Sequence, residues 1–287
     1  MNRKQLIDMV FRVSGNRDAF EMLEGALQGM NKTETEQALI ECGVLPEVFD
    51  HDSSEEKLWA KYSDILLARS FSFLGIKAEV MRTRGDSADV FGKTESYSIV
   101  GDAKTFRLSR TAKNQKDFKI KALDDWRRTN DYAVLVGPLN QFPANGSQIY
   151  QQAIERNVTI LSYVHLRFML ESFAGTEDLN PIWQTGTRLA ASLTKAHQKQ
   201  AIPYWREIDR VVSVAFGEES SALADLKRTE RDTTRQLGLE GIQYWESKIA
   251  EYWSLSKEDA IRRLIKADKI ERKIEQIRRA IDREGPL

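Results

Sequence analysis

The sequence predicts an α/β protein in which helices flank a mixed β-sheet and both ends of the chain are helical. Three observations lead to this prediction. Short apolar runs of strand length occur in the middle of the chain. Helical crossover segments separate the later runs, which favours mixed or parallel pairing of the strands. Apolar residues recur at helical spacing both before and after this region.

The N-terminal region, residues 1–52, is expected to hold two short helices in its first 42 positions. The apolar residues of the first helix lie at helical spacing and are Leu6, Met9, Val10 and Val13. The run from Thr33 to Glu36 resembles a capping box at the start of the second helix. A longer helix is expected to begin after Ser53 and to end at Gly75, since glycine is common just past a helix C-terminus.

Residues 53–176 are expected to form the core of the fold. Five strands are predicted, at residues 76–81, 88–91, 97–104, 132–136 and 158–162. Two helices, at residues 114–128 and 147–156, connect the third strand to the fourth and the fourth to the fifth. Connections of this length are typical of strand–helix–strand units.

Residues 177–287 are expected to form a charged helical region that joins the rest in one compact unit. Ser256, followed by Glu258 and Asp259, is a typical helix start because acidic side chains favour the first turn. The isoleucines of the last predicted helix form an apolar stripe and are Ile270, Ile274, Ile277 and Ile281.

The composition limits the possible functions. The 287 residues carry 43 basic and 43 acidic side chains, so any nucleic-acid binding must come from local patches. Cys42 is the only cysteine, which excludes an internal disulfide and a cysteine zinc site. No segment approaches the roughly 20 apolar residues of a membrane span. No apolar signal core follows the first residues, so we expect a cytoplasmic protein without membrane association.

Histidines and tryptophans are assigned structural roles. The three histidines are too scattered to suggest a metal cluster and are His51, His165 and His197. His165 lies among apolar neighbours and is expected to be buried. Five tryptophans are expected to lie in the core rather than to stack on bases, namely Trp126, Trp183, Trp205, Trp245 and Trp253.

The chemically most informative residues lie at the end of the third predicted strand. Asp102 and Lys104 are two positions apart, so their side chains share one face of the strand. A carboxylate there can hold a divalent cation, and an ammonium beside it can orient a water molecule. Asp89 precedes Asp102 by thirteen positions, which suits a hairpin-like pair of strands. We expect the two aspartates to hold Mg²⁺ and the lysine to activate water; the alternative is a salt-bridged pair on an exposed strand edge.

A basic tract follows this motif. Lysine or arginine recurs every three residues from Lys104 to Lys119. This interval does not stay on one face of an α-helix, because each step slips by about 60°. We expect a loop in which Arg107 and Arg110 contact the phosphates of a nucleic-acid backbone. Four residues have groups suited to reading base edges and are Lys113, Asn114, Gln115 and Lys116. The alternatives are a solvated charged face and, for Asn114, a helix N-cap.

Two further acidic residues have alternative roles. Asp117 can pair with Lys121 on its helix or serve as a further metal ligand. Glu56 can lie near the metal at the start of the long helix, although a capping-box role explains it more simply.

The region around this motif resembles the HindIII family of type II restriction endonucleases. The likeness is strongest from Asp102 to Lys119, a stretch long and polar enough to be specific. Weaker likeness extends over residues 45–149, and the C-terminal third resembles the family poorly. Ala88 stands where the general PD-(D/E)xK pattern has a proline.

The resemblance implies a restriction-endonuclease-like PD-(D/E)xK fold and a homodimer that cuts double-stranded DNA at the palindrome AAGCTT. Cleavage between the two adenines would leave 5′-phosphate ends with four-base 5′ overhangs. Mg²⁺ would be the cofactor, with Mn²⁺ expected to substitute. A cognate methyltransferase is expected in the same system but not as a stable subunit.

The resemblance also assigns residues. The family's Asp-x-Lys pair corresponds to Asp102 and Lys104. Its leading acid corresponds to Asp89, and its further metal-binding aspartate to Asp117. Its base-reading residues correspond to Asn114 and Lys116.

Two other functions stay open at the level of sequence. One is a DNA repair or junction nuclease with the same core, and the other is a DNA-binding protein that has lost cleavage. The intact set of Asp89, Asp102 and Lys104 argues against the second.

Overall fold

The computed structural model describes residues 1–82, 87–110, 115–217 and 220–281. The chain divides into two compact units, Met1–Gly238 and Leu239–Leu287, which we call unit 1 and unit 2. No helix within the described ranges is both long enough and apolar enough to cross a membrane.

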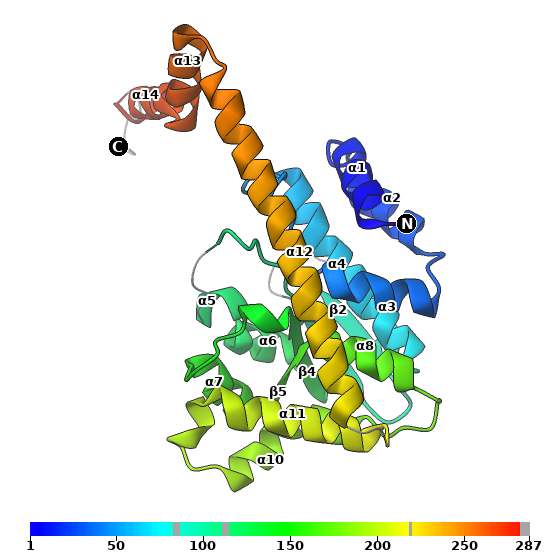
Figure 1. The fold of residues 1–287 in the computed structure, drawn as a ribbon. Helices are drawn as coiled ribbons and strands as arrows, with labels where there is room; N and C mark the ends of the chain where they lie inside the picture. The colour runs from blue at the N-terminus through cyan, green and yellow to red at the C-terminus, as the bar shows by residue number, and fades with distance from the viewer. Residues whose placement is uncertain (83–86, 111–114, 218–219, 282–287) are drawn as a thin grey trace. The chain divides into compact units, whose positions relative to one another are not determined.

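A five-stranded sheet forms the centre of unit 1 (Figure 1). Its strands lie in chain order and are β1 (Lys77–Val80), β2 (Val90–Lys93), β3 (Ser98–Ala103), β4 (Tyr132–Gly137) and β5 (Val158–Ser162). The first three strands pair antiparallel, whereas β3, β4 and β5 pair parallel. The predicted mixed sheet is therefore confirmed, with its parallel part at the predicted crossover helices.

Four helices precede the sheet and are α1 (Arg3–Val13), α2 (Ala19–Leu27), α3 (Lys32–Glu41) and α4 (Ser54–Phe73). The prediction of two helices before position 42 is wrong, because the turn at residues 14–18 separates α1 from a distinct α2. The capping box is built on Asn31 rather than Thr33: the Asn31 side chain and the Glu34 carboxylate each accept from the other's amide at 2.9 Å. Gly75 follows α4 with a φ of 77°, as predicted.

Two crossover connections join the parallel strands. The first contains α5 (Gln115–Phe118) and α6 (Ile120–Arg127), and the second contains η1 (Leu139–Gln141) and α7 (Gln148–Arg156). The prediction of one helix over residues 114–128 is wrong, because Lys119 has a φ of 50° and a left-handed residue interrupts an α-helix. Ser147 caps α7 by accepting a hydrogen bond from the Ile149 amide.

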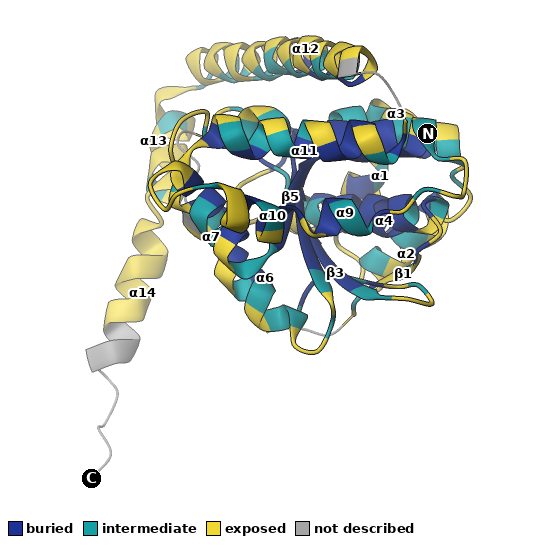
Figure 2. Ribbon diagram, turned by 90° about the horizontal axis from the view of Figure 1, so that it is seen from below, coloured by how far each residue is buried: buried dark blue, intermediate teal, exposed yellow. Residues whose placement is uncertain are grey.

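The helices after the sheet are α8 (Tyr163–Ser172), α9 (Asn180–Trp183), α10 (Thr185–Ser192), η2 (His197–Lys199), α11 (Ala201–Ala215) and α12 (Ser220–Trp253). All residues of β5, and all but the first of β4, are buried. Figure 2 shows β5 in dark blue. His165 and Trp183 are fully buried, as predicted. Trp126 and Trp205 are half-buried and pack against the core.

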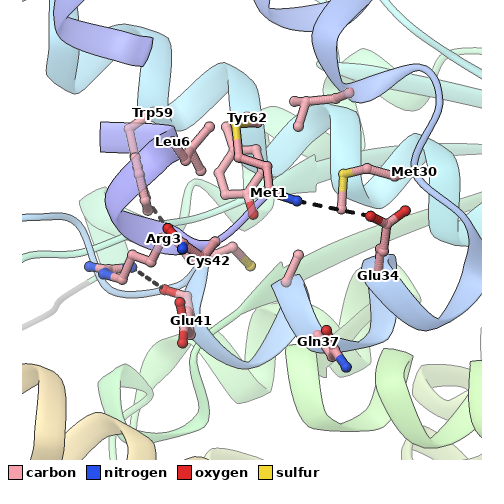
Figure 3. A pocket seen from close by; sticks show the side chains of 13 residues that line it. Met1, Arg3, Leu6, Met30, Glu34, Gln37, Glu41, Cys42, Trp59 and Tyr62 are labelled. Carbon is pink, nitrogen blue, oxygen red and sulfur yellow. Dashed lines mark hydrogen bonds and ion pairs between the residues drawn. The ribbon is translucent and has the colours of Figure 1, made fainter. Parts of the chain in front are cut away.

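The N-terminal helices and α4 line a pocket of about 310 Å³ (Figure 3). The Arg3 guanidinium donates to the carbonyls of Glu41 and Val44 at 2.9 and 2.8 Å, and it lies 4.9 Å over the ring of Trp59. Burial raises the pKa of the Cys42 thiol on the pocket wall, which keeps it protonated. These contacts tie the N-terminal helices to α4.

Unit 2 comprises the end of α12, α13 (Lys257–Ala267) and α14 (Ile270–Ile281). Ser256 caps α13 as predicted, accepting from the Asp259 amide at 3.1 Å. The prediction that Trp245 and Trp253 lie in the core is wrong, since they are 47% and 86% exposed. A short unit buries a smaller fraction of its surface than a large domain does, so large side chains on its helices stay exposed.

Candidate active site

The pairing of β2 with β3 brings two predicted site residues together. Val90 pairs with Gly101, so Asp89 and Asp102 are neighbours where β2 begins and β3 ends. Each carboxylate offers an oxygen within 4.8 Å of the other. The hairpin-like arrangement expected from their spacing is confirmed by this antiparallel register.

Lys104 lies beside Asp102, just beyond the end of β3. Its Nζ is 2.5 Å from Asp102 Oδ2. Its amide donates to the Val136 carbonyl at 2.7 Å, and its carbonyl accepts from the Tyr163 hydroxyl at 3.0 Å. The Asp102 side chain is 1% exposed and β3 is an inner strand, so the pair does not lie on an exposed strand edge.

Helix α4 contributes a third carboxylate that the sequence interpretation missed. Asp64 is 3% exposed, and one of its oxygens lies within the same 4.8 Å as those of Asp89 and Asp102. Lys61, one turn earlier, has its Nζ 3.0 Å from Asp64 Oδ2 and 2.5 Å from Asp89 Oδ1. The sequence carries a signal for this residue: Asp64 directly precedes the apolar run Ile65–Ala68, where burying a charge is costly without a partner.

Close packing of α4 on the sheet sets the position of these side chains. A Cβ atom on Gly101 of β3 would lie 2.9 Å from Leu67 Cδ2, so the absence of a side chain there permits the approach. Lys61, Asp64 and Leu67 recur at intervals of three residues on α4. The contact at Leu67 therefore turns the two charged residues toward the end of β3.

Burial and neighbouring charges control protonation in this cluster. Burial raises the pKa of Asp102; the Lys104 ammonium opposes the rise, and Asp89 adds to it. Burial also raises the pKa of Asp64 well above its ordinary value, and Asp89 adds to that rise. Burial disfavours the ammonium forms of Lys61 and Lys104, but the carboxylates they face raise the pKa of both. A divalent cation would relieve the repulsion among the carboxylates.

The donor set fits a hard divalent cation. Three carboxylates converge, and Asp102 Oδ1 is buried without a hydrogen-bond partner among the described residues. Buried polar atoms are rarely left in this state unless a ligand or water satisfies them. Carboxylate oxygens are the ligands that Mg²⁺ and similar ions prefer. The cluster can therefore hold a divalent metal ion.

The start of the basic tract is tied to the region before α4. Arg107 donates to three backbone carbonyls between residues 46 and 50, and to Glu56 Oε2 at 3.0 Å. Its side chain is only 12% exposed. Glu56 also accepts from the Asp52 amide at 2.9 Å, so it acts at the start of α4. Ser53 caps α4 by accepting from the Glu56 amide at 3.1 Å, but the Glu56 carboxylate accepts from Asp52 instead of Ser53, so only half of the expected capping box forms.

The rest of the tract is described in part. Lys113 and Asn114 lie outside the described residues. Gln115 is the first residue of α5, and Lys116 is exposed on the same short helix. The residues expected to read bases are therefore placed only by their position between β3 and α6.

Asp117 pairs with a basic side chain of the tract. It forms an ion pair with Arg110, and the cluster found among the described residues does not include it. The next residue, Phe118, is buried and stacks on Phe142 with ring centroids 4.8 Å apart. Phe118 therefore fixes α5 against the core with Asp117 beside it.

Comparison with known proteins identifies the family. The family model described as HindIII restriction endonuclease matches residues 4–281. The type II restriction enzyme HindIII of Haemophilus influenzae is 32% identical over 268 residues, which cover 91% of this chain and 88% of that enzyme. The similarity thus extends well beyond residues 45–149, into the C-terminal third. The chain belongs to the HindIII restriction endonuclease family and is a type II site-specific deoxyribonuclease with the corresponding α/β fold.

Proposed function

We propose that this enzyme cuts double-stranded DNA at the palindrome AAGCTT, between the two adenines, by Mg²⁺-dependent hydrolysis. The products would be 5′-phosphate ends with four-base 5′ overhangs. The observation that carries the hydrolytic part is the buried carboxylate of Asp102, with one oxygen unpartnered and Lys104 alongside. The recognition sequence rests on family membership and on the tract from Asp102 to Lys119.

Within the site, Asp89 and Asp102 would hold Mg²⁺, and Lys104 would orient the water that attacks the phosphorus. Asp102 fixes the ammonium of Lys104, while Val136 and Tyr163 fix its backbone. When bound, the ion supplies a Lewis acid that stabilises charge on the scissile phosphate and lowers the pKa of its water. Mn²⁺ accepts the same oxygen ligands and is expected to substitute.

Asp117 is proposed as a further metal ligand in the DNA complex. Its partner Arg110 is 55% exposed, so a DNA phosphate can compete for the guanidinium. Exchange of this ion pair would let the Asp117 carboxylate turn toward the cation. Recognition would then be coupled to cleavage through one short segment of chain.

The polar residues that follow Lys104 are proposed to contact DNA. Arg110 would bind phosphate, and four residues would read base edges, namely Lys113, Asn114, Gln115 and Lys116. Arg107 would take a supporting part in this DNA contact, because its guanidinium already anchors the tract to the carbonyls before α4.

A palindromic site favours a two-fold assembly, so we propose a homodimer in which each copy addresses one strand. Residues 53–176 would form the catalytic and recognition core of each copy. A cognate methyltransferase would act as a separate protein in the same system.

The deciding experiment is a digest of one sequenced plasmid with Mg²⁺. We expect discrete fragments whose ends fall at the AAGCTT positions. Smearing or nicks at irregular DNA structures would instead indicate a repair or junction nuclease. A mobility shift without any cut would indicate a binding protein and would overturn the proposal.

A further inference from the structure

We propose that helix α4 completes the active site: Asp64 is the third carboxylate ligand of the cation, and Lys61 is the positioning residue that holds Asp64 and Asp89. This inference rests on the proposed function only in taking the cluster around Asp102 as the metal site. It adds two residues that lie outside the Asp-x-Lys motif and its neighbouring strands.

The burial of Asp64 is the first observation. A carboxylate that is 3% exposed on a helix otherwise packed against the sheet costs free energy that an apolar side chain would not. Its oxygen nevertheless lies within 4.8 Å of both strand carboxylates. Carboxylates this close repel one another, and a divalent cation bound among them would relieve that repulsion.

The second, independent observation is the unpartnered oxygen on the adjoining strand. Asp102 is 1% exposed, and its Oδ1 has no hydrogen-bond partner in the part of the chain that the structure describes. Asp102 therefore offers a ligand atom that no protein group occupies, and Asp64 lies on the helix packed over the same strand end. A cation there would contact the helix and the sheet together.

Lys61 occupies the more open side of the cluster. Its Nζ bridges Asp64 Oδ2 at 3.0 Å and Asp89 Oδ1 at 2.5 Å, and Lys61 and Asp89 are 36% and 34% exposed. Lys104 lies on the buried side against Asp102. Two ammonium groups thus face three carboxyl groups, so a cation that binds there competes with both ammonium groups for the carboxylate oxygens. Lys61 keeps Asp89 next to Asp64 while the cation is absent.

The test measures Mn²⁺ affinity of the full-length protein without DNA, by electron paramagnetic resonance, and plasmid cleavage in parallel. The test variants are Asp64→Asn, Lys61→Met and Lys61→Arg. Asp124→Asn is the matched acidic control, because Asp124 is half-buried and ion-paired with Arg127 and Arg156 away from the cluster. Lys227→Met is the matched basic control, because Lys227 also lies 2.5 Å from an aspartate oxygen.

The two α4 residues should shift Mn²⁺ affinity in opposite directions. Asp64→Asn should weaken Mn²⁺ binding and slow cleavage, each by about 10- to 100-fold, through loss of a ligand charge. Lys61→Met should tighten Mn²⁺ binding by about tenfold, since a competing positive charge is gone. It should still slow cleavage by about 10- to 100-fold, because Asp89 loses its orientation. Lys61→Arg should restore most of the cleavage, and both controls should behave as wild type.

Three results would overturn the inference. Asp64→Asn with wild-type Mn²⁺ affinity removes Asp64 from the ligand set. If Lys61→Met weakens both Mn²⁺ binding and cleavage, and Lys61→Arg does not restore cleavage, then Lys61 has only a structural role. Thermal unfolding in EDTA checks that each variant folds. If Asp64→Asn does not fold, Asp64→Ala removes the carboxylate and leaves no polar group in its place; unchanged Mn²⁺ affinity in that variant also removes Asp64 from the ligand set.

Failure of the proposed function would look different. Mn²⁺ affinity is measured without DNA, so it does not depend on where or whether the enzyme cuts. A wild-type protein that binds Mn²⁺ through Asp64 but leaves AAGCTT sites intact would contradict only the proposed function. A protein that cuts AAGCTT while Asp64→Asn binds Mn²⁺ normally would contradict only the inference.

Discussion

Two buried polar networks in unit 1 share most of their chemistry and differ in one respect. In the histidine network, His165 Nδ1 lies 2.6 Å from Ser162 Oγ, and Nε2 lies 2.9 Å from Asp209 Oδ1. Lys227 Nζ is 2.5 Å from the same Asp209 oxygen, and Trp205 stacks on the imidazole with centroids 5.6 Å apart. Each of the four polar side chains therefore has a partner inside the protein.

The acidic cluster also lies at the carboxyl end of a parallel strand. Ser162 ends β5 and Asp102 lies one residue before the end of β3. The Asp102 carboxylate is buried like the His165 imidazole, but its Oδ1 has no partner in the described ranges. Place in the sheet does not separate a site from a structural network here, whereas an unsatisfied buried oxygen does.

The largest expected effect is the loss of DNA cleavage in the Asp102→Asn variant. Removal of the buried charge should slow plasmid cleavage by at least about 10³-fold, because the metal and Lys104 both depend on it. The unfolding free energy in EDTA should stay the same or rise, since burial and Asp89 disfavour the charged form. Cleavage rates and urea unfolding measure the two quantities. If Asp102→Asn cuts at the wild-type rate, the unpartnered Asp102 oxygen does not mark a catalytic site, and the two networks are not distinguished by it.

His165→Ala should lower stability strongly and leave cleavage nearly unchanged, the reverse of what is expected for Asp102→Asn. Loss of the imidazole removes the histidine partner of Ser162, leaves Asp209 with Lys227 alone, and opens a cavity against Trp205. The unfolding free energy should fall by about 4 kcal/mol. Cleavage per folded molecule, measured well below the melting temperature, should be retained. A large loss of cleavage in fully folded His165→Ala would place the histidine network in the catalytic machinery.

A pH effect is expected from Glu230, which α12 brings close to the histidine network. Burial raises the pKa of Glu230 to about 7, against a weak hydrogen bond from the Leu139 amide and the charge of Lys227. The folded state then binds the proton more tightly than the unfolded state. This contribution is full below the unfolded pKa near 4.5 and is lost as pH rises through about 7.

Glu230→Gln keeps an acceptor for the Leu139 amide and removes the charge. Its unfolding free energy should exceed that of wild type by up to about 3 kcal/mol at pH 8, with little difference at pH 4. Urea unfolding across this range measures the difference. A constant difference at all pH values would mean that Glu230 does not titrate as stated.

Much of the fold could be predicted because local patterns and global packing agree. The five strands and α7 follow apolar runs with clear boundaries, and Ser147 and Ser256 act as caps in the expected way. The misplaced elements had weaker local signals. Lys119 adopts a left-handed conformation without being glycine, and Trp253 belongs to a helix with an uncovered side.

The candidate site divides in the same way. Asp102 and Lys104 share a face because strand geometry requires it, so two positions of sequence were enough. Asp64 and Lys61 join them only because Gly101 lets Leu67 approach the sheet, a contact between residues 34 positions apart that no local pattern encodes. Arg107 was expected at the phosphates for its charge, but its carbonyl partners come from a loop some sixty residues earlier.

The smallest expected effect comes from Lys227→Met, and it is informative because Lys227 and Lys61 have nearly the same geometry. Each ammonium lies 2.5 Å from an aspartate oxygen, and the side chains are 23% and 36% exposed. Lys227→Met should lower the unfolding free energy by only about 1 kcal/mol, because a partly exposed ion pair usually contributes no more than that to stability. Cleavage per folded molecule should not change, because Asp209 still has His165 as a partner and no vacant ligand atom depends on Lys227. Reduced cleavage in this variant, measured beside Lys61→Met, would show that partner satisfaction does not separate the two networks.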